Sequence, residues 1–309
     1  MPKKRNDASS KHHASQKKKS NSATKPINGS STSDNKPRNL LLLDASGPLT
    51  FQFRQYGTPI TLTFDQTAEE STWPGGAVWD LGWVLARFFC GSVATTTTMP
   101  GQHTLRRPGV VVSNHVHQLP LVRQKLRCIL ELGCGVGLTG IVAAAALHPS
   151  LTLLTDLRVV VDRVTHPNVL RNTVRTTGVL PKSGGSRILA LPLCWGNADD
   201  ETAVWERMGR QAPDLVIVGD VAYQHKPGAP SHFEALVSTM VRLAGPSTMV
   251  VMGVRIRMPA SVDLVHMIQE HFVEAAAAVS VEDIEPSLAH VKHNMTIHFF
   301  RKKKGSAGC

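Results

Sequence analysis

Apolar residues recur from residue 126 onward in two alternating patterns, one typical of buried strands and one typical of helices. Strand-like runs occupy 128–132, 151–155, 188–191, 214–218 and 249–254. Helix-period segments occupy 139–147, 159–177, 233–243 and 262–272, with an interruption or restart expected at Pro167. Two further strand-like runs follow at 275–281 and 295–300. Because strands joined through helices pair in parallel, this order predicts an α/β fold with a doubly wound seven-stranded sheet, mostly parallel with an antiparallel C-terminal strand.

The segment before this repeat has a different pattern. Apolar residues at 50–54 and 60–64, on either side of a Tyr-Gly-Thr-Pro turn at 56–59, predict an N-terminal β-hairpin. Helical spacing over 78–89 predicts a helix. Residues 91–124 hold four consecutive threonines and several Pro and Gly, without a sustained period apart from 110–112. We expect them to form a surface insertion.

Charge and composition separate the two ends of the chain from its middle. Residues 1–39 have almost no large apolar side chains, which predicts a disordered basic tail, followed by a folded domain at 40–304 and a flexible C-terminus at 305–309. The tail holds ten Lys or Arg against two Asp, a net charge of +8, and Arg301–Lys304 adds +4. Since the whole chain carries +11, the residues between these two segments carry −1. A nucleic-acid site on the folded surface is therefore not favoured, although the tails could assist such binding.

Other classes are excluded by what the sequence lacks. It has no secretory leader and no run of about 18 apolar residues, so no membrane association is expected. Five cysteines without a C-x-x-C pair indicate a reducing compartment, and no His or Cys spacing fits a metal site. Lys4-Arg5 and Lys17–Lys19 resemble a two-part nuclear import signal, so we expect the protein to be cytoplasmic, nuclear or both. We also expect it to be a monomer.

Glycines cluster directly after the strand predicted at 128–132. The sequence there is Glu131-Leu132-Gly133-Cys134-Gly135-Val136-Gly137. In a doubly wound sheet, ligands bind beyond the carboxyl ends of the strands, and glycines let the backbone turn sharply and approach a ligand closely. From Gly135 the segment also spells G-x-G-x-x-G, and Asp156, about twenty residues downstream, would suit the ribose of a dinucleotide or of S-adenosylmethionine. The loop alone leaves a nicotinamide oxidoreductase and a methyltransferase both open.

Further motifs favour the methyltransferase. Glu131 stands two residues before the first glycine, in the E-x-G-x-G-x-G register of S-adenosylmethionine enzymes. The chain also contains, in order, GAVWD at 76–80, ILELGCGVGLTGI at 129–141, TDL at 155–157, LCWG at 193–196 and DLVIVGDVAY at 214–223. It thereby resembles the small seven-strand protein-lysine methyltransferases from about Phe51 to Arg301, apart from the insertion. The resemblance implies a Rossmann-like domain, S-adenosyl-L-methionine as cofactor, and a lysine of a protein substrate as acceptor.

The same resemblance implies which residues bind the cofactor: Trp79, Glu131, Gly133, Cys134, Gly135, Gly137, Asp156, Leu157, Trp195 and Asp220. Asp156 would accept hydrogen bonds from the ribose hydroxyls, and Glu131 would lie near the cationic methionine end. Trp195 would lie beside the adenine and Trp79 would help to wall the cofactor, because an indole offers a flat apolar face with a polar edge. Both tryptophans could instead be core packing residues.

Asp220 and Tyr223 form a D-x-x-Y signature and are the implied catalytic residues. A carboxylate at Asp220 can hold a lysine amine by a charge-assisted hydrogen bond. Tyr223 can shape an apolar channel or share a hydrogen bond, or it can be a core residue with a satisfied hydroxyl. The implied reaction is an in-line displacement in which a lysine, with a free pKa of about 10.4, first loses its proton through desolvation and the nearby sulfonium charge. No separate strong base is expected.

Several alternatives remain open at this stage. Related enzymes of the same architecture methylate histidine or arginine on proteins, and more distant ones act on small molecules or RNA. The basic tail would help an RNA substrate, but the core lacks a basic patch interleaved with aromatic residues. A nicotinamide oxidoreductase and a non-catalytic scaffold that binds a partner through its tails are the remaining readings.

Overall fold

The computed structural model describes residues 48–55, 58–67, 74–90, 96–97, 105–106, 125–175, 187–223, 232–257, 259–288 and 295–305, all within one compact unit, Arg38–Cys309. The tail predicted at 1–39 lies outside these residues, as does most of the predicted insertion at 91–124. Within the described part, every helix is too short or too polar to span a bilayer.

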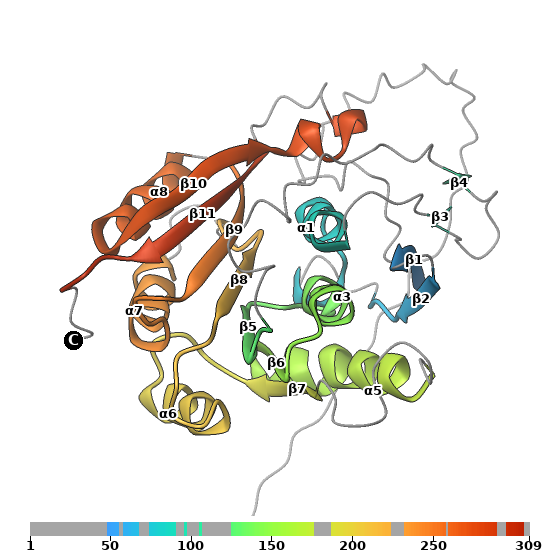
Figure 1. Cartoon of the computed structure of the whole chain (residues 1–309), viewed down its shortest axis with the longest axis horizontal. Helices are drawn as coiled ribbons and strands as arrows, with labels where there is room; N and C mark the ends of the chain where they lie inside the picture. The colour runs from blue at the N-terminus through green and yellow to red at the C-terminus, as the bar shows by residue number, and fades with distance from the viewer. Residues whose placement is uncertain are drawn as a thin grey trace, which may run out of the picture. The chain divides into compact units, whose positions relative to one another are not determined.

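A seven-stranded sheet forms the centre of the fold (Figure 1). Its strands, from one edge to the other, are β7 (Arg187–Pro192), β6 (Leu151–Asp156), β5 (Cys128–Leu132), β8 (Leu215–Gly219), β9 (Met249–Arg255), β11 (Met295–Lys302) and β10 (Phe272–Ser280). The first five are mutually parallel, and β11 runs antiparallel to both of its neighbours. The predicted seven-stranded, mostly parallel sheet is therefore confirmed.

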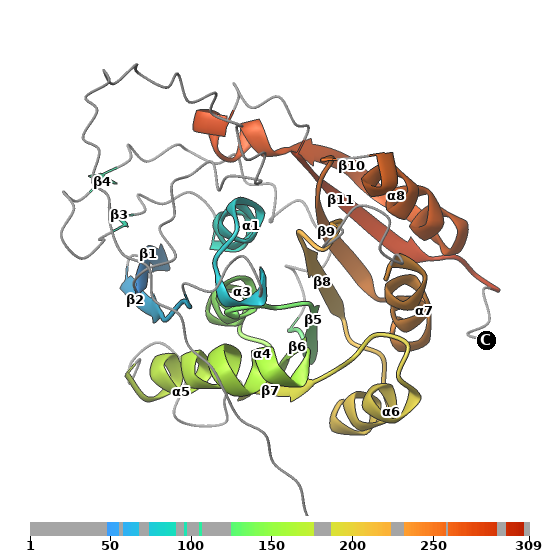
Figure 2. The same ribbon diagram turned by 180° about the vertical axis from the view of Figure 1, so that it is seen from behind.

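Helices cover both faces of the sheet (Figures 1 and 2). One face carries α1 (Asp80–Cys90), α3 (Leu138–Leu147) and α5 (His166–Arg175), and the other carries α6 (Ala198–Arg207), α7 (Phe233–Leu243) and α8 (Pro259–His271). The central strands β5 and β9 are buried at every position, and as expected of strands covered on both faces their residues are apolar except for Glu131 in β5 and Arg255 at the end of β9. Short 3₁₀ turns lie at Pro74–Gly76, Val281–Asp283 and Pro286–Leu288.

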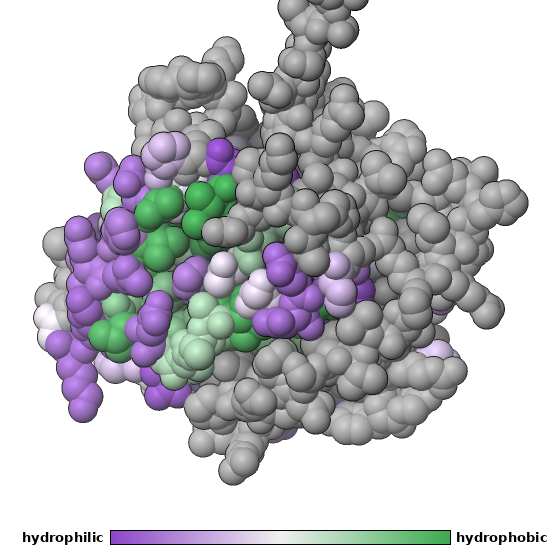
Figure 3. All heavy atoms as spheres, turned by 90° about the horizontal axis from the view of Figure 1, so that it is seen from above, coloured by the Kyte–Doolittle hydropathy of each residue, from purple (hydrophilic) through white to green (hydrophobic). Residues whose placement is uncertain are grey.

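The edge strand β10 differs from the inner strands in its exposure. Val273 and the four alanines Ala275–Ala278 are exposed, and the pairing of β10 with β11 has register shifts. Figure 3 shows apolar surface among hydrophilic side chains on the side of the molecule that holds β10 and α8. The helix α8 ends at His271 and β10 begins at Phe272, so the gap expected between helix and strand is absent.

The helix predicted over 159–177 is observed in three parts. It begins as α4 (Arg158–Val160), widens into a π-helical segment, η3 (Val161–Thr165), and continues as α5. Pro167 lies in the first turn of α5, where it has no N–H to donate and its ring would crowd the carbonyl four residues earlier. A widened helix just before Pro167 relieves that conflict, so the expected interruption is a π-helical segment.

One helix was not predicted. In α6 only Glu201 and Val204 are buried, so no apolar stripe marks the helix in the sequence. Its start is fixed instead by Asn197, whose side-chain oxygen accepts hydrogen bonds from the backbone N–H groups of Asp199 and Asp200 at 3.1 and 3.0 Å. Glu201 then anchors the helix by accepting a 2.6 Å hydrogen bond from the Thr239 hydroxyl of α7.

The predicted hairpin is confirmed as β1 (Leu49–Gln55) and β2 (Thr58–Phe64), which pair antiparallel. Within the insertion, β3 (Thr96–Thr97) and β4 (Leu105–Arg106) form a short antiparallel ladder. The strand-like run at 110–112 lies outside the described residues. The helix predicted at 78–89 begins two residues later than expected, at Asp80.

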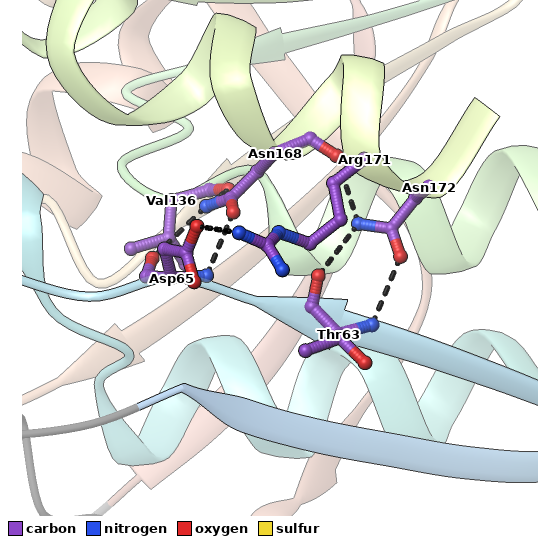
Figure 4. Close-up of polar contacts among 6 residues, drawn as sticks. All are labelled: Thr63, Asp65, Val136, Asn168, Arg171 and Asn172. Carbon is purple, nitrogen blue, oxygen red and sulfur yellow. Dashed lines mark hydrogen bonds and ion pairs between the residues drawn. The ribbon is translucent and has the colours of Figure 1, made fainter. Parts of the chain in front are cut away.

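Two buried asparagines attach β2 to α5 (Figure 4). The Asn172 amide accepts from the N–H of Thr63 and donates to the carbonyl of Thr63, both at 2.9 Å. One turn earlier, the Asn168 amide accepts from Asp65 N–H at 2.7 Å and donates to the carbonyl oxygens of Asp65 and Val136, both at 3.0 Å. Each amide thus satisfies backbone groups as a neighbouring strand would, and Asn168 also holds the loop that follows β5.

Candidate functional site

A cavity of about 340 Å³ lies beyond the carboxyl ends of the parallel strands. The strand order reverses between β5 and β8, and such a switch point is where doubly wound sheets bind their ligands. The lining comes from the segments that follow β5, β6, β7 and β8, from the residues before and within α1, and from the start of α7. It consists of Gly75, Ala77, Val78, Trp79, Gly82, Glu131, Gly133, Cys134, Gly135, Val136, Leu138, Thr139, Asp156, Leu157, Leu193, Cys194, Trp195, Gly219, Asp220, Val221, Tyr223, His232 and Ala235. All but one of the predicted site residues, Gly137, lie in this lining.

The loop after β5 needs glycine for two separate reasons. Gly133 and Gly135 have φ values of 72° and 52°, in the left-handed region that residues with a side chain avoid. A Cβ on Gly133 would also lie 2.9 Å from Val221 Cγ1 and 3.1 Å from Trp195 Cζ2, and one on Gly135 would lie 3.2 Å from the Gly75 carbonyl oxygen. Both the backbone conformation and the space at the cavity therefore exclude larger residues.

The later glycines of the motif have a packing role. Gly137 is the left-handed N-cap of α3, and a Cβ there would meet Leu154 Cδ1 at 3.2 Å. A Cβ on Gly140 would lie 2.4 Å from Glu131 Oε2 and 2.2 Å from Leu154 Cδ2. Gly140 therefore lets β5 and its carboxylate approach α3, and Gly137, which was predicted to bind the cofactor, lies behind the loop and outside the cavity lining.

Two carboxylates face the cavity from β5 and β6, the buried Glu131 and the half-buried Asp156. Glu131 accepts a 3.0 Å hydrogen bond from Gly140 N–H, and burial raises the pKa of its carboxyl to about 8. Asp156 accepts from the N–H groups of Gly135 at 2.8 Å and Leu157 at 2.7 Å, and burial raises the pKa of Asp156 to about 6. Each Asp156 oxygen has a second lone-pair direction, so the carboxylate can still accept hydroxyl donors such as those of a ribose.

The charge of the cavity indicates the kind of ligand that it can hold. Its lining contains three acids, Glu131, Asp156 and Asp220, but no Lys or Arg among the described residues. Within that part of the chain, neither Glu131 nor Asp156 forms an ion pair. A ligand with positive charge complements such a site, whereas a pyrophosphate would face two carboxylates with no compensating cation. The residues present therefore fit a sulfonium nucleoside better than a dinucleotide.

Aromatic side chains form another part of the cavity wall. Trp195 is half-buried, with its ring edge close to Gly133, and the ring of His232 lies 5.4 Å from it, centroid to centroid. His232 also lies 5.6 Å from the ring of Tyr223. His232 was not predicted, because no motif surrounds it and only the fold brings the start of α7 to the cavity. The thiol of Cys134 is buried, and burial raises its pKa, so it is no nucleophile.

Asp220 has a different environment from the one predicted. It follows β8 directly with φ of 54°, and its side chain is buried. Both carboxylate oxygens are already paired with Arg257, with Nη1 to Oδ1 at 2.5 Å and Nη2 to Oδ2 at 2.7 Å. The charge of Asp220 is therefore already balanced by Arg257, and the role predicted for this carboxylate in holding a lysine amine stays a prediction. Arg257 was not predicted, although Arg-Ile-Arg at the end of a central strand is a signal that could have pointed to it.

Neighbouring groups surround this ion pair. The guanidinium carbon of Arg257 lies 6.0 Å from the centroid of the Trp79 ring. A second buried pair, Arg255 with Asp80, lies beside it with a nitrogen-to-oxygen distance of 3.3 Å. Burial raises the pKa of Tyr223 to about 12, which keeps its phenol neutral at physiological pH. This end of the cavity therefore has paired charges and a neutral hydroxyl.

Comparisons with known proteins give the family. The sequence model of a family described as lysine methyltransferase matches residues 58–274. The chain is 25% identical over 173 residues to protein N-lysine methyltransferase METTL21A of Xenopus tropicalis, an overlap of 56% of this chain and 64% of the relative, so it spans just under two thirds of that relative's length.

Solved structures align with part of the chain at low sequence identity. A precorrin-6y C5,15-methyltransferase from Geobacter metallireducens aligns with a TM-score of 0.38 at 11% identity, over 62% of this chain and 88% of that one. An O-methyltransferase from Bacillus cereus aligns with a TM-score of 0.39 at 16% identity, over 60% of this chain and 78% of that one.

The match to the family's sequence model, over residues 58–274, spans most of the 309 residues. The chain therefore belongs to the lysine methyltransferase family, whose methyl donor is S-adenosylmethionine.

Proposed function

We propose that this protein transfers a methyl group from S-adenosylmethionine to the side-chain nitrogen of a lysine in another protein. The family match and the METTL21A relative support this acceptor class. The observation that carries the proposal is the acidic cavity at the switch point, where Glu131 and Asp156 face the ligand space without a cationic partner among the described residues.

Each residue of the cavity has a distinct task in this proposal. Asp156 accepts the ribose hydroxyls, and Trp195 and Leu157 flank the adenine with apolar surface. Glu131 places negative charge near the cationic end of the donor. When bound, the donor supplies an electrophilic methyl group on a sulfonium. The glycine loop brings backbone close to the ligand because Gly133 and Gly135 carry no side chain.

The acceptor enters at the end of the cavity formed by Trp79, Asp220 and Tyr223. Trp79 and Tyr223 exclude water from the incoming side chain, which favours the neutral, nucleophilic amine over the ammonium. The neutral hydroxyl of Tyr223 can accept a hydrogen bond from that amine and orient its lone pair. Positioning and desolvation, without a strong base, then supply the rate.

The test uses an extract of methyltransferase-depleted cells incubated with the purified protein and labelled S-adenosylmethionine. We expect label that resists nuclease, disappears with protease, and elutes as methyl-lysine after acid hydrolysis. Label in methyl-histidine or methyl-arginine would show that a residue other than lysine is the acceptor. Label removed by nuclease alone would overturn the proposal that the substrate is a protein. Gly133→Ala is the inactive control, because its methyl group would intrude on Trp195 and Val221.

A further inference from the structure

We propose that Arg257 is a positioning residue that sets the charge state of the acceptor: by pairing with both oxygens of Asp220, it neutralises that carboxylate, weakens its attraction for a lysine ammonium and so favours the amine in its neutral form. This inference rests on the proposed lysine methyltransferase function. It assigns a role in selecting the reactive form of the substrate to Arg257, which pairs with the lining residue Asp220 but does not itself line the cavity.

The Asp220 carboxylate is fixed in place. Its backbone is in the left-handed region, with φ of 54°, and its N–H donates to the Gly253 carbonyl at 3.2 Å. The side chains of Asp220 and Arg257 are only 4% and 12% exposed, and two hydrogen bonds of 2.5 and 2.7 Å join them. A two-pronged pair of this kind fixes the plane of both groups, so Asp220 cannot turn toward an acceptor without breaking it.

Arg257 is itself held from a second side. Its guanidinium lies 6.0 Å from the centroid of the Trp79 ring, within the range of a cation–π contact. Trp79 lines the same cavity as Asp220, so the arginine lies between two elements of the acceptor wall. Opening the pair would therefore cost both the ionic hydrogen bonds and the aromatic contact.

Of the three carboxylates that face this point, Asp80 and Asp220 are paired with guanidiniums and Asp156 is not. The ionisable groups that face it are Asp80 from α1, Arg255 and Arg257 from the end of β9, Asp220 and Tyr223 from the end of β8, Asp156 from the end of β6, and His232 from the start of α7. Two carboxylates pair with two guanidiniums, and the tyrosine is neutral. A lysine that reaches Tyr223 thus meets paired charges.

An unpaired Asp220 would have the opposite effect on catalysis. A free carboxylate beside an amine favours the ammonium and raises its pKa, and each pKa unit lowers the neutral fraction about tenfold. An ammonium has no lone pair for attack on a methyl group. By neutralising Asp220, the positive charge of Arg257 therefore removes the electrostatic stabilisation that this carboxylate would give to the unreactive ammonium.

The experiment measures how pH changes the affinity of n-butylamine, a lysine side-chain probe, for the full-length protein saturated with S-adenosylhomocysteine, by saturation-transfer NMR between pH 7 and 9. For the wild-type protein we expect affinity to rise about tenfold per pH unit, in step with the neutral amine. Arg257→Gln frees Asp220, so its affinity should be higher at pH 7 and nearly independent of pH. Arg257→Lys should restore the steep dependence, because an ammonium can also neutralise Asp220.

Two further variants separate this role from a structural one. Asp220→Asn combined with Arg257→Gln leaves an uncharged pair and should keep the steep wild-type dependence even though the ion pair is gone. Arg210→Gln removes an arginine paired with Glu206 on the exposed surface and should change nothing. A pH-independent affinity in the wild-type protein, or the same slope in Arg257→Gln, would overturn the inference. The proposed function fails separately, if the labelled extract contains no methyl-lysine.

Discussion

Gly133 is the residue at which backbone geometry and cavity shape are most tightly linked. Its φ of 72° disfavours any side chain, and the space beside it is taken by Val221 and Trp195. We expect Gly133→Ala to lower the affinity for S-adenosylhomocysteine roughly tenfold or more, which corresponds to about 1.4 kcal/mol, as measured by calorimetry. The reason is that the added methyl group displaces Trp195 into the ligand space.

The matched control for this variant is Gly209→Ala. Gly209 has a similar φ of 75°, but no atom lies within 4 Å of the position where its Cβ would be. Both variants carry the cost of a left-handed alanine, about 1 kcal/mol, and Gly133→Ala also displaces Val221 and Trp195, so it should lose at least as much stability to denaturant as Gly209→Ala. If both also lost affinity to the same extent, the affinity loss in Gly133→Ala would come from global instability and not from the cavity.

Glu131 should give the protein without ligand an unusual dependence of stability on pH. Burial raises its pKa from 4.5 to about 8, so the folded state holds a proton that the unfolded state releases. This contribution to stability is complete below pH 4.5 and is lost as the pH rises through about 8. We therefore expect the free energy of unfolding to fall between pH 5 and 8 in urea titrations.

Glu131→Gln tests the assignment of that slope. The glutamine keeps the shape and can still accept the hydrogen bond from Gly140 N–H, but it does not titrate. The decline in stability between pH 5 and 8 should therefore become shallower. An unchanged slope in this variant would show that another group is responsible.

At the scale of elements, the two asparagines of α5 connect the N-terminal hairpin to the ligand loop. Asn168→Ala would leave three backbone groups without their partner: the N–H and carbonyl of Asp65 and the carbonyl of Val136. We expect a loss of about 2–4 kcal/mol in unfolding free energy, together with weaker S-adenosylhomocysteine binding, because Val136 lines the cavity. Equilibrium unfolding and calorimetry measure both effects.

Thr173→Ala is the control on the same helix. Among the described residues, the Thr173 hydroxyl donates to carbonyls of its own helix alone, at Val169 and Leu170. Its removal should therefore leave ligand affinity unchanged and alter stability by less than about 1 kcal/mol. A stability loss in Thr173→Ala as large as that in Asn168→Ala would mean that the amide clamp has no special role.

Elements with a continuous apolar pattern were predictable from the sequence, and elements held by polar contacts were not. The strand at Cys128–Leu132 has the predicted bounds, because burial on both faces leaves a nearly continuous apolar run in which Glu131 is the one polar residue. The helix α6 gave no such signal, because its anchors are the Asn197 cap and the buried Glu201, which bonds to Thr239 and Arg242 of α7. Polar anchoring of this kind depends on partners distant in sequence.

At the scale of the whole molecule, the site could be located because each motif follows a strand whose end reaches one edge of the sheet. That rule placed Asp156, Trp195 and Asp220 together. It could not show that Asp220 is already paired, since Arg257 follows the next strand of the sheet, β9, and lies outside the motifs that located the site. Motifs therefore predicted the position of the cavity, while the ionic contacts within it required the fold.

The charge of the whole molecule and the charge of the cavity have opposite signs. The chain carries +11 overall, yet the cavity lining presents three carboxylates and no Lys or Arg among the described residues. A cationic nucleoside should therefore shift Glu131 toward its ionised form on binding. Because Glu131 has a pKa of about 8 without ligand, it is mostly protonated at pH 7 and would release a proton.

Calorimetric titration with S-adenosylmethionine at pH 7, in two buffers of different ionisation enthalpy, tests this central claim most directly. The account predicts binding accompanied by net proton release, a smaller release in Glu131→Gln, and no heat with NAD. Binding of NAD in place of S-adenosylmethionine would contradict it.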